Sequence, residues 1–118
     1  MSVETPQDAA RERSRLSRAL RESIDEMKAA GETRAEAEHA YDYEFARALL
    51  KSEATSADKR KAQATVDTEK QHKDYLVAEV GETYWKTRVK GILSDLSALM
   101  TIAAGIRREF EEAHRGPN

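Results

Sequence analysis

Hydrophobic positions recur at three- and four-residue steps along most of the chain, which is the spacing of one face of an α-helix. The first such stripe contains Leu16, Leu20, Ile24 and Met27. Thr5 is a suitable N-cap, Pro6 a suitable first helical residue, and Gly31 is typical of the position after a helix end. The pattern predicts a first helix over about residues 5–30.

A second helix is predicted over about residues 33–51. Thr33 and Glu36 form the spacing of a capping box, in which each side chain satisfies a free backbone N–H. The apolar stripe of this segment contains Ala37, Tyr41, Phe45, Ala48 and Leu49. A polar turn over residues 52–58 follows, and Thr55 or Ser56 is expected to cap the next helix.

A long helix is predicted over about residues 57–114, because no proline interrupts it. From Trp85 onward its apolar seam follows steps of four and three, a heptad pattern typical of coiled coils. This seam contains Trp85, Val89, Ile92, Leu96, Leu99, Ala103, Ile106, Phe110 and Ala113. Carried back before Trp85, the same register is mostly polar, and a second stripe of Val66, Leu76, Val80 and Tyr84 fits better. We therefore expect an irregularity near Gly81.

These elements predict an all-α fold with one domain over residues 1–118. We expect an antiparallel helical hairpin with a long coiled-coil-like C-terminal helix plus an N-terminal helix, which docks within its own chain or onto a neighbour. The seam is expected to form an interface between helices, through Trp85, Val89, Ile92, Leu96, Leu99, Ile106 and Phe110.

Composition favours an assembly of several chains. The 118 residues are 39% hydrophobic, 36% charged and only 6% aromatic, so one chain has little apolar surface to bury. We therefore expect a homo-oligomer. The absence of cysteine excludes a disulfide scaffold and a thiolate metal site, and it is compatible with the cytoplasm. The longest apolar run, Ile92–Ile106, contains several polar residues and is shorter than the ~20 residues of a membrane span, so no membrane partner is expected.

Arginines gather in the first predicted helix, where only Glu12 opposes them. They are Arg11, Arg13, Arg15, Arg18 and Arg21. One interpretation is nucleic-acid binding, because arginines neutralise backbone phosphates. The other interpretation is pairing with the acidic segment 32–44, within a chain or between chains. A net charge of -2 gives no argument from the whole chain for a nucleic-acid or a membrane partner.

All three histidines occur in a Glu-x-x-His pattern, which is also the ligand spacing of di-iron helical bundles. The pairs are Glu36–His39, Glu69–His72 and Glu111–His114. Helical periodicity turns the first pair away from its apolar stripe, so we expect solvated pairs and no metal site. The chain contains no glycine-rich phosphate loop and no nucleophile elbow, and we expect neither an enzyme nor a cofactor.

From about Ala37 to Phe110 the chain resembles small all-helical accessory proteins of tailed bacteriophages. The resemblance lies in Tyr43–Lys51 at the end of a helix, a short polar turn, and a long charged helix through Tyr84–Lys86, Ile92–Leu99 and Arg107–Phe110. It implies an accessory protein of the host cytoplasm that binds another phage or host protein, with DNA recombination as a possible setting. It implies no reaction.

Overall fold

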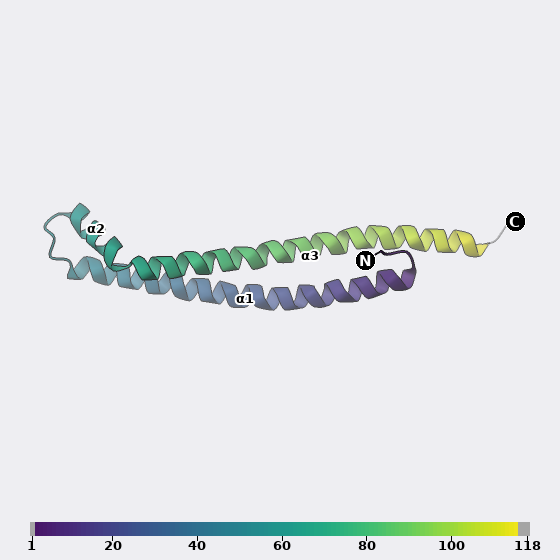
Figure 1. Ribbon diagram of the computed structural model, residues 1–118, viewed down its shortest axis with the longest axis horizontal. Helices are drawn as coiled ribbons and strands as arrows, with labels where there is room; N and C mark the ends of the chain where they lie inside the picture. The colour runs from purple at the N-terminus through teal and green to yellow at the C-terminus, as the bar shows by residue number, and fades with distance from the viewer. Residues whose placement is uncertain (1, 116–118) are drawn as a thin grey trace. The chain divides into compact units, whose positions relative to one another are not determined.

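The computed structural model describes residues 2–115 and is all-α in this range. The helices are α1 (Pro6–Lys51), α2 (Ala57–Asp67) and α3 (Glu69–Arg115). They form two compact units, which we call the terminal unit (Met1–Asp25 with Lys86–Asn118) and the central unit (Glu26–Trp85). Within each unit a segment of α1 lies beside a segment of α3, so the predicted helical hairpin is confirmed (Figure 1).

The predicted break between a first and a second helix is wrong, because α1 continues through Gly31. The Thr33 hydroxyl donates to the Ala29 carbonyl oxygen at 3.1 Å, which is a bond within a helix and not the predicted cap. A helix tolerates an interior glycine at a cost of about 1 kcal/mol. The start of α1 agrees with the prediction: Thr5 Oγ1 accepts from the Asp8 N–H at 3.1 Å.

The predicted long helix is also divided, at Thr68. Thr68 has φ -111° and ψ 19°, and its hydroxyl donates to the Ala64 carbonyl oxygen at 2.7 Å. This buried side chain therefore satisfies a backbone carbonyl oxygen in the last turn of α2. Ser56 caps the start of α2, as one of the two expected residues, by accepting from the Lys59 N–H at 3.2 Å.

The irregularity expected near Gly81 does not occur, because α3 is helical from Glu69 to Arg115. The heptad seam instead runs back unchanged from Trp85 through polar positions. In the central unit the inner face of α3 contains Gln71, Tyr75, Ala78 and Glu82, and Thr68, just before α3, continues the same register. The alternative stripe is exposed, at 68% for Val66 and 70% for Val80. The prediction failed because polar side chains occupy the seam, and one of them, Glu82, pairs with Arg34 of α1.

The core of the terminal unit is one apolar cluster. Ala9 and Leu16 of α1 pack with Ile92 and Leu99 of α3, and Leu20 and Leu96 pack against them. Ser23, only 3% exposed, takes the inner position expected for Ile24, which is 42% exposed. The inner face of α1 thus keeps alternating steps of four and three from Leu16 onward.

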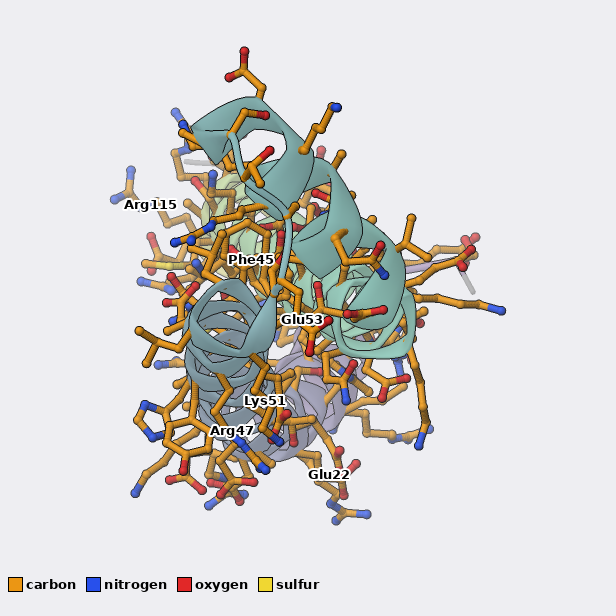
Figure 2. All side chains as sticks on the ribbon, turned by 90° about the vertical axis from the view of Figure 1, so that its left-hand side faces the viewer. Glu22, Phe45, Arg47, Lys51, Glu53 and Arg115 are labelled. Carbon is orange, nitrogen blue, oxygen red and sulfur yellow. The ribbon has the colours of Figure 1, made fainter. Side chains whose placement is uncertain are left out.

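The central unit has a thinner and more polar core. Ala64 of α2 is fully buried. Tyr41 stands in the middle of the seam, with its ring centroid 6.0 Å from Phe45 and 6.2 Å from Tyr75. In the end-on view of Figure 2, Phe45 and Arg47 lie on opposite sides of α1, as a half-buried and an exposed residue should.

Candidate functional site

The predicted interface residues form the inner face of α3. Ile92, Leu99 and Ile106 are each at most 8% exposed, and Trp85, Val89 and Leu96 are half-buried. In the terminal unit this face packs against Ala9 and Leu16 of the same chain. Phe110 differs, with 39% of its surface exposed. A role of the seam in contacts between chains stays a prediction, while its packing within the chain is observed.

Large apolar side chains also lie on the outer face of α3 in the central unit. We call this surface the outer stripe: Leu76, Val77, Val80 and Tyr84. Their exposed fractions are between 45% and 70%. The residues are spaced so that they share one face, about half a turn away from the seam. Leu76, Val80 and Tyr84 belong to the stripe that the sequence pattern predicted to face inward.

A groove of about 610 Å³ lies between α1 and α3 in the terminal unit, on one side of the seam. Ala9, Leu96 and Leu99 form part of its apolar lining, together with Met100, which is 65% exposed. Arg13 lines it from α1 and Arg107 from α3. We call this surface the arginine groove. The sequence pattern indicated no groove role for Met100 or Arg107, although each directly follows a seam residue in the heptad.

A second groove, of about 360 Å³, flanks the other side of the same seam. It contains charges of both signs, from Glu12, Arg15 and Asp95. Arg15 forms an ion pair with Glu12, and this hydrogen bond raises the pKa of Arg15 and lowers the pKa of Glu12. The Glu12 and Arg15 charges of this second groove therefore compensate one another, and Asp95 adds a negative charge.

All five predicted nucleic-acid-binding arginines are exposed. Arg11, Arg15 and Arg18 line a shallow depression on α1, and Arg13 lines the arginine groove. Arg21 lies further along the same helix. The expected pairing of this basic segment with segment 32–44 as a separate helix of the same chain is wrong, because both segments belong to the continuous helix α1.

The polar seam of the central unit contains a network of charges and rings. Arg34 Nε lies 3.2 Å from Glu82 Oε2, and Arg34 Nη1 lies 2.5 Å from Glu38 Oε2. The exposed His72 borders this seam, with its ring centroid 4.9 Å from that of Tyr41. A hydrogen bond with Glu79, together with burial, raises the pKa of Tyr75. These groups are matched to one another, which is typical of a structural network.

The three Glu-x-x-His pairs lie on exposed surfaces. His39, His72 and His114 are all exposed, and His114 Nδ1 is bonded to the Phe110 carbonyl oxygen at 2.7 Å. Within residues 2–115, no three side chains of the types that bind metals are grouped as a site.

By length and composition alone, α3 is the one helix of the described chain that includes a stretch apolar enough to cross a membrane. The core helix of a soluble protein satisfies the same criteria, although such a helix is mostly buried. In α3 only 22% of the stretch is buried. The hairpin therefore leaves much of its most apolar segment uncovered. No protein family, no curated protein and no solved structure matches this chain.

Proposed function

We propose that this chain is a non-catalytic accessory or adaptor protein that acts through helix-mediated oligomerisation and partner binding. The observation that supports this function best is the outer stripe, which exposes four large apolar side chains on one face of α3. A contiguous apolar patch on a soluble protein is typical of an interaction site. An apolar helix face can pair with the same face of a second copy about a twofold axis, so the occupant we propose is a second copy.

The setting of this function rests on the sequence resemblance alone. The resemblance to phage accessory proteins suggests that the assembly works in the host cytoplasm, on another phage or host protein, in DNA recombination. The helical hairpin is compatible with such a role, since long helices can present binding surfaces at fixed spacing.

Solution mass tests the assembly. We expect size-exclusion chromatography with light scattering to give a mass well above the 13.3 kDa of one chain. Val80→Glu places a charge in the outer stripe and should lower that mass, because a charge is costly to bury. Thr83→Glu adds the same charge at an exposed position beside the stripe and should lower it less. A monomer at every concentration would contradict the oligomeric function.

Nucleic-acid binding is the second candidate, because Arg11, Arg13, Arg15, Arg18 and Arg21 are all exposed on one segment of α1. Phosphate contacts make affinity fall steeply with salt, with a slope of about -0.9 per neutralised phosphate. We expect retention on double-stranded DNA that weakens with salt and disappears in the triple variant Arg13→Glu, Arg15→Glu and Arg18→Glu. Absent or salt-independent retention would contradict this candidate.

A further inference from the structure

We propose that the arginine groove of the terminal unit binds an acidic amphipathic helix of a partner protein. This inference rests on the adaptor function and names the chemistry of its partner. It concerns a different surface from the outer stripe, so the two can be tested separately.

The groove has the shape that a third helix requires. Two helices that pack along one seam leave a furrow on each side, and a third helix completes the core when it lies in that furrow. Ala9, Ala10 and Ala103 line the arginine groove with small side chains that permit close approach. Met100 is unbranched and 65% exposed, so it can adjust to the surface of an incoming helix.

The charge of the groove selects an acidic partner. Its charged lining residues are Arg13 and Arg107, one from each helix, and no acid is among the lining residues that the structure describes. Residues one helical turn from Arg13 are Ala9, Ala10, Leu16 and Ser17, so α1 offers it no carboxylate at that spacing. Along α3 the acids near Arg107 are Glu109, two residues on, and Glu111, one helical turn on, and both are exposed and absent from the groove lining.

The second groove of the same unit provides an internal comparison. There Arg15 is paired with Glu12, and Asp95 adds a further negative charge. A partner charge of either sign would meet a charge of its own sign there, from Arg15 or from Glu12 and Asp95. In the arginine groove, glutamates that flank the apolar face of a docked helix would face Arg13 and Arg107, as e and g residues do in coiled coils. DNA would satisfy the arginines but would leave the apolar floor around Met100 uncovered.

Two synthetic peptides and the full chain test this inference. Both peptides are amphipathic helices with leucine at the a and d positions, and they carry either glutamate or lysine at the e and g positions. We expect fluorescence anisotropy to show that the glutamate peptide binds at least about tenfold more tightly than the lysine peptide. The double variant Arg13→Glu with Arg107→Glu should reverse this preference.

A matched control changes the same net charge elsewhere. Arg18 and Arg108 are exposed, belong to α1 and α3 respectively, and do not line the groove. The double variant Arg18→Glu with Arg108→Glu should therefore keep the preference for the glutamate peptide. Circular dichroism of both double variants verifies that each remains helical, and the reversal itself requires a folded groove.

Three results would overturn the inference. The first is equal binding of both peptides, or a preference that the groove variant does not reverse. The second is a duplex DNA that binds with loss only in the groove variant while neither peptide binds. The third is a fall in solution mass of the groove variant without peptide, which would assign the groove to a second copy. Each can occur while Val80→Glu still lowers the mass, so the adaptor function is judged separately.

Discussion

Arg34 on α1 meets Glu82 on α3 across the seam of the central unit, with 3.2 Å between Arg34 Nε and Glu82 Oε2. Only 14% of the Glu82 side chain and 30% of the Arg34 side chain are exposed. The hydrogen bond with Glu82 raises the pKa of Arg34. A charged pair therefore stands where a coiled coil usually places leucine or isoleucine.

Replacing one member of this pair should destabilise the protein more than replacing both. Arg34→Leu and Glu82→Leu each remove one charge of the pair. The other charge then stays in a partly desolvated seam without this partner. The double leucine variant packs two apolar residues there and should recover the loss. Urea unfolding at constant m-value measures the three midpoints. A double variant that loses the sum of both single effects would show that the pair does not act as a unit.

Gly31 adjoins the same pair, because a Cβ atom built on it would lie 2.9 Å from Glu82 Oε2. Gly81 has nothing within 4 Å of its Cβ position. We expect Gly81→Ala to raise the free energy of unfolding by about 1 kcal/mol through helix propensity. Gly31→Ala should gain less, since the Glu82 carboxylate must move. Equal gains in denaturant titrations would mean that the carboxylate shifts without cost.

The start of α1 should respond to acid. The Asp8 carboxylate accepts from the Glu4 N–H at 3.2 Å and the Thr5 N–H at 3.1 Å, and the Glu4 bond contributes most to lowering the pKa of Asp8 below its ordinary 3.8. A lowered folded pKa stabilises the protein above the unfolded value, and this contribution disappears as pH falls through the folded pKa. Asp8→Asn should therefore cost stability at pH 7 and little at pH values below both pKa values. Thr5→Ala, which removes the cap itself, should cost about 1 kcal/mol. Thermal unfolding as a function of pH measures both, and a constant difference between wild type and Asp8→Asn would contradict this linkage.

Variants of Leu99 and Met100 should differ in their effects on stability and on peptide binding. Leu99 is 6% exposed and belongs to the core cluster, whereas Met100 is 65% exposed. Leu99→Ala should lower the free energy of unfolding by about 2–5 kcal/mol. Met100→Ala should change it by less than about 0.5 kcal/mol and weaken binding of the glutamate peptide. Urea unfolding measures both variants. Similar losses of stability would contradict the burial of Leu99 in the core and the exposure of Met100 on the surface.

The apolar part of the fold could be predicted from the sequence, and the polar part could not. The seam from Trp85 to Ile106 follows directly from its heptad spacing, and the turn before Ser56 follows from its polar residues. The inward position of Glu82 escaped prediction, because its partner Arg34 lies on the other helix. Gln71 is also turned inward, and its side-chain Oε1 has no hydrogen-bond partner among the described residues. Gly31 also led to a wrong prediction of a helix end. It lies inside α1, where the absence of a side chain leaves room for the Glu82 carboxylate of the other helix.

The candidate site was predicted in part. The exposure of the five arginines follows from their charge, and the structure bears it out. The place of Arg107 and Met100 in a groove could not be predicted from the sequence, because residues of both α1 and α3 line the groove. Their heptad positions do indicate that they lie near a groove, because residues next to the a and d positions border the furrow between two packed helices.

The Arg34–Glu82 pair also affects the register in which α1 and α3 pack against each other. Two long antiparallel helices with repeating apolar seams can slide by a heptad and still bury similar residues. A slip of seven residues along α3 would set Arg34 against Tyr75 in one direction or Val89 in the other, and neither offers a carboxylate. The polar seam thus gives up some packing, and the Arg34–Glu82 pair favours the observed alignment of the two helices over one shifted by a heptad.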